Sequence, residues 1–134
     1  MRKVIIEGKV CIGPTFSKAE FALIKRNLAK QKGLATLADL LNVAGNIQRL
    51  RIIYLLHAHR EMCVCDLAEV LGLTDSAVSQ HLRKLKDKNI VRSRRQGQTI
   101  FYSLVQNIFT TNLQNTFALD ETKEPHAFMH KEIA

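Results

Sequence analysis

Apolar residues recur every three or four positions through the first half of the chain, with polar residues between them. This period is typical of helices that bury one face. Ser17 followed by Glu20 has the pattern of a helix start in which each residue caps the other. Caps and breaks therefore predict three helices before residue 60, over about 17–33, 36–44 and 47–57.

The pattern after residue 60 predicts a helix-turn-helix. A short helix over 67–71 ends at Gly72, and Thr74 is placed to cap a second helix over 75–88. Helical spacing in the second helix predicts one buried face, formed by Val78, Leu82 and Leu85.

Two short stretches over 91–95 and 99–104 follow, both rich in β-branched and aromatic residues. The segment 96–98 between them has a central glycine, so a β-hairpin is expected. A basic hairpin directly after a helix-turn-helix is typical of a wing. We favour this interpretation over a simple sheet edge whose charges prevent pairing with other chains. The expected fold class is mainly α with a small β-hairpin, a winged helix-turn-helix.

The ends of the chain lack this regularity. Residues 1–16 show no clear period and Gly13-Pro14 marks a turn, so a flexible arm carrying Cys11 is expected there. A last helix over about 105–119 completes a single domain of residues 17–119. Residues 120–134 are interpreted as a loose tail.

Composition supports one packed domain, because the chain has 134 residues of which 46% are hydrophobic. No apolar run is long enough to span a membrane, and no membrane partner is expected. The first residues carry charges and lack the apolar region and cleavage site of a signal peptide. The expected compartment is the cytoplasm, where an odd count of three cysteines argues against a disulfide framework.

The net charge of +8 is unevenly distributed. Residues 1–32 carry eight basic and two acidic side chains, and residues 81–95 carry seven basic and one acidic. Two basic blocks suggest a polyanionic partner, most simply double-stranded DNA, although charge alone does not separate this from two solvated faces.

The polar face of the helix over 75–88 has the side chains that such DNA binding needs. Hydroxyl, amide and guanidinium groups near its start can reach base edges in a major groove, and lysines further along suit phosphates. The wing would add contacts at its tip. The candidate DNA-binding residues are Ser76, Ser79, Gln80, Arg83, Lys84, Arg94 and Arg95.

Cys63 and Cys65 form the candidate metal site, because thiolates select soft ions. In a regular helix, residues two apart point about 200° away from each other, so a shared ion requires an irregular helix start. Taken alone, a Cys-x-Cys pair is equally compatible with structural cysteines.

Several segments within residues 35–105 resemble the ArsR/SmtB family of metal-sensing winged-helix repressors. They lie at 48–53, 61–68, 76–82, 96–98 and 102–104, and the Cys-Val-Cys-Asp-Leu run is closest to the cadmium/lead-sensing and arsenite-sensing branches. The resemblance implies a homodimer that binds palindromic operator DNA when metal-free and dissociates on binding the ion.

The resemblance also implies dimerisation through the first and last helices, here 18–31 and about 105–119. The same pattern in the last helix fits packing on its own domain. The candidate interface stripe is Val105, Ile108, Phe109, Asn112, Leu113 and Phe117.

By the same resemblance Cys11 is the third ligand, since arms in the cadmium/lead branch donate cysteines to the pair of the other protomer. This chain lacks a second arm cysteine, which favours three sulfurs and hence Pb(II), As(III) or Hg(II). Cd(II) or Zn(II) would need a fourth ligand, such as water or Asp66, unless Asp66 caps the helix from residue 67. The arsenite branch can use a further helix cysteine, but position 68 is Ala. Whether Cys11 acts in cis or across the dimer stays open.

Other sites and functions are less favoured. A second family site uses carboxylates and histidines in the last helix, and residues 105–119 contain none. His126 and His130 could share a zinc ion on a helix, but Pro125 favours a loose tail. A rival function is a winged-helix regulator whose cysteines sense oxidants. An enzyme is not expected, because no nucleophile–base pair, phosphate loop or carboxylate pair stands out.

Overall fold

The computed structural model describes residues 2–120 of the chain. These residues belong to two compact units, Met1–Leu37 and Ala38–Ala134. The possible zinc pair of His126 and His130 lies outside the described residues. Among the described helices, none is both long and apolar enough to cross a membrane.

The first unit begins with a β-hairpin where the sequence predicted only an arm. Strands β1 (Arg2–Ile6) and β2 (Lys9–Gly13) pair antiparallel, with Val4 opposite Cys11. Almost every residue of the hairpin is exposed, so neither face has the alternation that marks a half-buried strand. The turn is formed by Glu7 and Gly8, both at positive φ, as two-residue hairpin turns require.

Helix α1 (Lys18–Ala29) starts as predicted. The backbone N–H of Glu20 donates to Ser17 Oγ at 3.2 Å, and the N–H of Ser17 donates to a Glu20 carboxylate oxygen at 3.4 Å. This reciprocal pair satisfies two amides that the helix leaves without partners. None of its residues is buried, and Leu23, Ile24 and Leu28 are 52%, 44% and 62% exposed.

Helix α2 (Gly33–Ala44) begins three residues earlier than predicted and continues into the second unit, where α3 (Ile47–His59) follows. Asn46 caps α3 by accepting from the backbone N–H groups of residues 48 and 49, as expected. Ile47, which its helical spacing predicts to face inward, is instead 58% exposed at the first position of the helix. The buried residues of α3 are Ile52, Ile53 and Leu56.

The predicted helix-turn-helix consists of α4 (Val64–Leu71) and α5 (Asp75–Asp87). Gly72 ends α4 in the left-handed conformation, which glycine adopts without steric cost. Thr74 caps α5 by accepting from the N–H of residue 77 at 3.1 Å. The predicted buried face is confirmed, with Val78, Leu82 and Leu85 all at 0% exposure.

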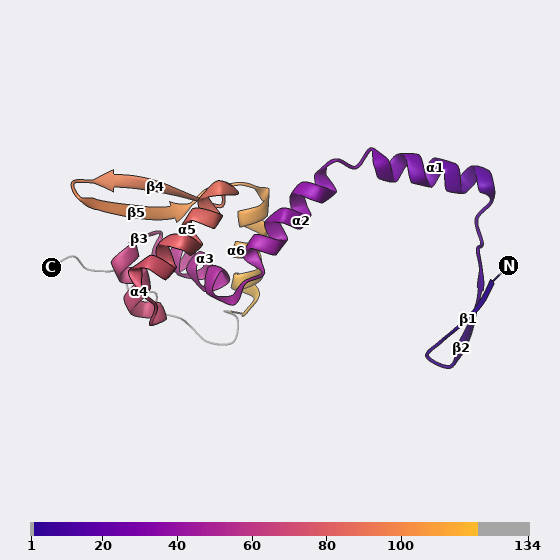
Figure 1. Ribbon diagram of the computed structural model, residues 1–134, viewed down its shortest axis with the longest axis horizontal. Helices are drawn as coiled ribbons and strands as arrows, with labels where there is room; N and C mark the ends of the chain where they lie inside the picture. Colours follow the sequence, from indigo (N-terminus) through magenta and orange to yellow (C-terminus); the bar gives the residue numbers. More distant parts are fainter. Residues whose placement is uncertain (1, 121–134) are drawn as a thin grey trace. The chain divides into compact units, whose positions relative to one another are not determined.

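The predicted wing is formed by β4 (Val91–Gln96) and β5 (Thr99–Leu104), which lie side by side in Figure 1. A third strand that the sequence did not predict, β3 (Glu61–Cys63), pairs with the other edge of β5. Phe101 lies opposite both Cys63 and Arg94, so these three residues form one row across the sheet. The wing is therefore joined to the strand that carries the first candidate metal ligand.

Helix α6 (Ile108–Asp120) begins three residues later than expected. The residues of its predicted interface stripe do not all lie on one exposed face. Phe109, Leu113 and Phe117 pack partly buried against the core of their own unit, and the Phe117 ring contacts Tyr54 edge-on at 5.5 Å. Ile108, by contrast, is 82% exposed.

The start of α6 holds the buried polar residue Thr110, which is 0% exposed. Its hydroxyl donates to the Val105 carbonyl at 2.6 Å and accepts from the Asn107 N–H at 3.0 Å. Removal of a buried hydroxyl leaves such partners unsatisfied.

We expect Thr110→Val to lower the free energy of unfolding by about 1–2 kcal/mol. Thr116→Val is the matched control, because the Thr116 hydroxyl also donates to a backbone carbonyl of α6 but is exposed. It should change stability by less than about 0.5 kcal/mol. Urea unfolding followed by circular dichroism measures both, and equal losses would show that burial of Thr110 is not the cause.

Candidate functional site

Helix α5 presents a continuous polar face on the side opposite its buried residues. The base-reading candidates Ser76, Ser79, Gln80 and Arg83 are all exposed, as is Lys84. The apolar face is fixed in the core, so these side chains have a defined direction away from the protein. Such a surface can be placed in a major groove by a helix-turn-helix.

Two further lysines that suit phosphates are engaged within the protein. Lys86 Nζ donates to the Ser93 hydroxyl on β4 at 2.9 Å. Lys88 Nζ lies 3.9 Å from an Asp39 carboxylate oxygen. Both contacts are exposed, so these lysines add to the positive potential of the surface while they help to position α5 against its neighbours.

Arg94 is held in place by several partners at the wing. Its guanidinium donates to both carboxylate oxygens of Glu61, at 2.6 and 3.1 Å, and lies 5.0 Å from the Phe101 ring centre. The hydrogen bond to Arg94 is the main cause that holds the pKa of Glu61 below its ordinary value. Arg95, closer to the turn, donates to the Gly97 carbonyl at 3.0 Å and stays exposed. The charge of Arg94 is therefore compensated, and Arg95 is better placed for a nucleic acid.

His81 lies on the same helix but turns partly toward the protein. Loss of solvation lowers the pKa of its imidazole, and the positive charges of Arg49 and Lys84 lower it further. His81 is therefore held in its neutral form around neutral pH.

Cys63 and Cys65 lie on either side of a strand-to-helix junction. Cys63 ends β3 and is also the residue that precedes the first helical residue of α4, with extended backbone angles of φ −88° and ψ 168°. Cys65 is the second residue of α4 and is exposed. The 200° separation of a regular helix does not apply to a pair that begins in a strand. The pair therefore spans the change from strand to helix, outside the regular helix in which two such residues would point apart.

The idea that Asp66 caps the helix from residue 67 is wrong, because α4 begins at Val64. Its cap position is occupied by Cys63, which makes no capping hydrogen bond through its side chain. Asp66 lies in the first turn instead, where its charge suits the positive end of the helix dipole.

A carboxylate from the recognition helix lies beside the cysteines. Cys65 Sγ donates to Asp75 Oδ2 at 4.0 Å, across the turn that joins α4 to α5. The negative charge of Asp75 is the main cause that raises the pKa of the Cys65 thiol, followed by loss of solvation and by the neighbouring Cys63 and Asp66. No sequence pattern predicts a role for Asp75, because only the folded turn brings it to Cys65.

The donor set fits a soft ion but is incomplete within each unit. Cys11, Cys63 and Cys65 are free thiols, the donors that thiophilic ions prefer. Within residues 2–120, no three His, Cys, Asp or Glu side chains gather closely enough to hold a metal ion. Cys11 is exposed on β2 of the first unit, whereas the pair belongs to the second. Within the described residues, Cys63 and Cys65 are therefore two donors without a third metal ligand gathered beside them.

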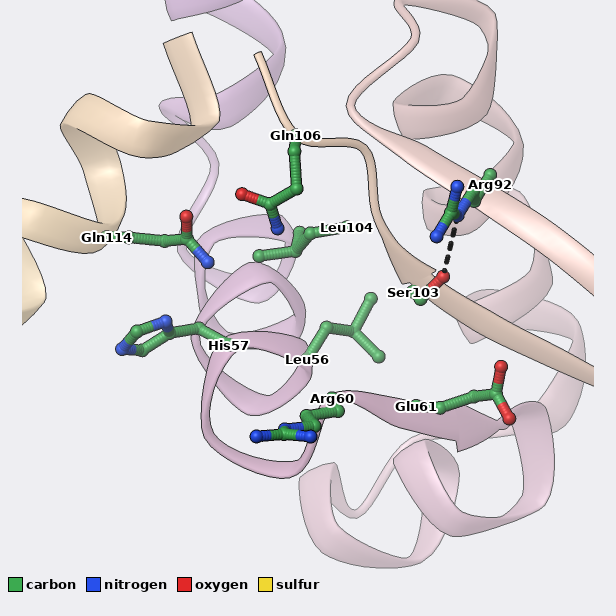
Figure 2. A pocket seen from close by; sticks show the side chains of 9 residues that line it. All are labelled: Leu56, His57, Arg60, Glu61, Arg92, Ser103, Leu104, Gln106 and Gln114. Atoms are coloured by element: carbon green, nitrogen blue, oxygen red, sulfur yellow. Dashed lines mark hydrogen bonds between the residues drawn. The ribbon is translucent and has the colours of Figure 1, made fainter. Parts of the chain in front are cut away.

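A pocket of about 440 Å³ that no sequence pattern predicts lies between α3, the sheet and α6. In Figure 2, His57 and Gln114 lie on one side of it, and Arg92 and Ser103 on the other, joined by a hydrogen bond of 3.3 Å. No sequence motif marks this site, because its lining comes from separate elements. The complete lining is Leu56, His57, Arg60, Glu61, Arg92, Ser103, Leu104, Gln106 and Gln114.

The chain is similar to curated regulators of metal resistance. It is 35% identical over 80 residues to the cadmium resistance transcriptional regulatory protein CadC homolog of Staphylococcus aureus, which covers 60% of this chain and 65% of that protein. It is 30% identical over 93 residues to the CadC protein of Listeria innocua, covering 66% of this chain and 77% of the relative. Among the first relatives matched, the chain spans between half and two thirds of their length.

Solved structures show the same fold. HlyU from Vibrio cholerae superposes with a TM-score of 0.62 at 32% identity, covering 66% of this chain and 96% of HlyU. The structure described as reduced HlyU gives a TM-score of 0.57 at 31% identity, covering 71% of this chain and 95% of that one. The family described as "Bacterial regulatory protein, arsR family" matches residues 47–93, which hold the helix-turn-helix and both clustered cysteines. Together with the likeness to CadC over three quarters of its length, this match shows that the chain belongs to the ArsR family of bacterial regulatory proteins.

Proposed function

We propose that this protein is a transcriptional repressor that binds operator DNA as a metal-free homodimer and releases it on binding a thiophilic ion. The observation that carries the proposal is the position of the cysteine pair. Cys63 and Cys65 stand at the start of the helix that directly precedes the recognition helix. An ion bound there is next to the surface that would read DNA.

The DNA-binding part is supported by the exposed polar face of α5 and by its charge. Ser76, Ser79, Gln80 and Arg83 offer groups that can bond base edges, with Lys84 and Arg95 directed to phosphates. The net charge of +8 favours association with a polyanion. Arg94 contributes mainly by fixing the wing through Glu61.

The homodimer is supported by apolar surface that one chain leaves uncovered. Leu23, Ile24 and Leu28 on α1 are all more than 40% exposed, and Ile108 on α6 is 82% exposed. Apolar groups of this size gain free energy when they leave water. A second copy that covers them would also supply two recognition helices for two half-sites of a palindrome.

The ion is proposed to be bound by Cys63 and Cys65, completed by Cys11 of the same or the other chain. Three thiolates suit Pb(II), As(III) or Hg(II), while Cd(II) or Zn(II) would take a fourth ligand. The relatives named for cadmium resistance support a metal effector of this soft class. When bound, the ion supplies a cross-link between chain segments, and the thiols supply its selectivity.

Release of the operator depends on the thermodynamic coupling between ion binding and DNA binding. An ion can lower operator affinity only if it binds the DNA-free dimer more tightly than the DNA-bound dimer. A shift of α4 by the bound ion would change the spacing of the two recognition helices, which must match successive major grooves. Such couplings typically weaken binding by about 5–150-fold.

A second candidate function, oxidant sensing by the cysteines, is favoured by the likeness to a structure described as reduced HlyU. Both functions use thiolates, so the cysteines alone do not separate them. The metal function is preferred because relatives named for cadmium resistance match this chain.

The DNA-reading surface predicts a loss of operator affinity on substitution. With a duplex selected from a random-sequence pool by the purified protein, Gln80→Ala or Arg83→Ala should each weaken binding by about 1–3 kcal/mol. Arg51→Ala, which removes an exposed arginine from α3, is the control and should have little effect. Fluorescence anisotropy at fixed salt measures each affinity, and an unchanged affinity in both α5 variants would exclude this face.

The metal site predicts sulfur-to-metal charge-transfer bands in the reduced protein. Ultraviolet titrations with Pb(II), Cd(II), Zn(II), Hg(II) and As(III) should give saturable bands. Cys11→Ser, Cys63→Ser and Cys65→Ser should each weaken these bands, because each removes one of three sulfur ligands. If Cys11→Ser changes neither bands nor affinity for any ion, the three-sulfur site is wrong.

The raised pKa of Cys65 predicts slow reaction with alkylating reagents. In a Cys11→Ser, Cys63→Ser background, Asp75→Asn removes the main raising charge, so the pKa falls and more thiolate is present at pH 7.5. Iodoacetamide should then react about twofold faster or more, with the difference fading at pH values above the thiol pKa. Glu69→Gln, which removes a charge elsewhere on α4, is the control. A rate unchanged by Asp75→Asn would show that Asp75 does not control this thiol.

A further inference from the structure

A side-chain hydrogen bond connects the starts of α4 and α5. Cys65 is the second residue of α4 and Asp75 is the first residue of α5, and the thiol donates to the carboxylate at 4.0 Å. Both side chains are exposed, so neither is fixed by the core. The contact therefore connects the candidate ion site to the end of the recognition helix that enters DNA.

From this contact we infer that Asp75 is the positioning residue through which an ion on Cys65 acts on the recognition helix. The inference rests on the proposed function and deepens it, since it names the link between the ion and α5. In the metal-free chain the Asp75 carboxylate accepts from the Cys65 thiol. An ion bound at Cys65 would take the place of that proton as the partner of the carboxylate.

An ion bound at Cys65 Sγ would displace the thiol proton, which would leave to solvent. The sulfur would then no longer donate to Asp75, so the carboxylate would lose its present partner. Asp75 would be free to turn toward the positive charge of the ion.

A movement of Asp75 reaches the base-reading residues directly. Ser76 is the next residue and Ser79 and Gln80 lie one turn further along. Asp75 is also the acidic residue in the first turn of α5, so that turn offers the ion one carboxylate. A helix whose buried face remains in the core can still tilt at its exposed first turn, which alters its fit to a groove.

Paired titrations test the inference. The operator affinity of the wild-type chain, Asp75→Asn and Asp87→Asn is measured with and without Cd(II), and the thiolate bands are recorded on the same samples. Asp87→Asn removes the same charge from the last residue of α5. Loss of a negative charge should strengthen metal-free DNA binding in both variants, so the readout is the ratio of affinities with and without the ion.

We expect Cd(II) to weaken operator binding by about 5–150-fold in the wild-type chain and in Asp87→Asn. In Asp75→Asn the thiolate bands should persist. The ratio of operator affinities without and with Cd(II) should be at least about fivefold smaller than in the wild-type chain. Asp75→Glu restores a carboxylate and should recover part of the response. Metal-free operator binding by each variant shows that it is folded.

The possible failures are distinguishable. A wild-type chain that shows neither bands nor release overturns the proposed function, and the role of Asp75 with it. A wild-type chain that responds, together with an Asp75→Asn variant that responds equally, overturns only the role of Asp75. An Asp87→Asn variant that loses the response as fully as Asp75→Asn overturns it as well, since charge alone would then be the cause.

Discussion

The burial of one face of α5 is the constraint on which the rest of the candidate site depends. Val78, Leu82 and Leu85 are completely inaccessible to solvent and pack with residues of α3, α4 and β4 in a single core. A helix fixed in this way can present only its opposite face to a partner. The direction of the candidate DNA-binding residues, the proximity of α4 and the position of the wing all follow from it.

The sequence predicts the elements that have a strong local pattern. Helix α5 has a clear period and a cap at Thr74, and both were predicted correctly. Strand β3 was missed, because three residues carry no period and pair only once β5 is in place. The first hairpin was missed because it has no buried face to impose alternation. The predicted interface stripe of α6 is only partly exposed, because Phe109 and Leu113 pack against the core of their own unit.

The candidate site was predictable as a set of residue types but not as a geometry. The exposure of Gln80 and Arg83 follows from their place on an amphipathic helix. The approach of Asp75 to Cys65 does not, because the two are ten residues apart and meet only through the turn at Gly72. The compensation of Arg94 by Glu61 spans 33 residues and is likewise set by strand pairing.

Cys63, Phe101 and Arg94 form one row across the three-stranded sheet. This register restricts the movements that are open to β3. A strand that slipped by one residue would turn its side chains to the opposite face, so β3 cannot slide along β5 in small steps. A displacement of Cys63 would therefore involve all three strands together, up to the hairpin turn at Gly97.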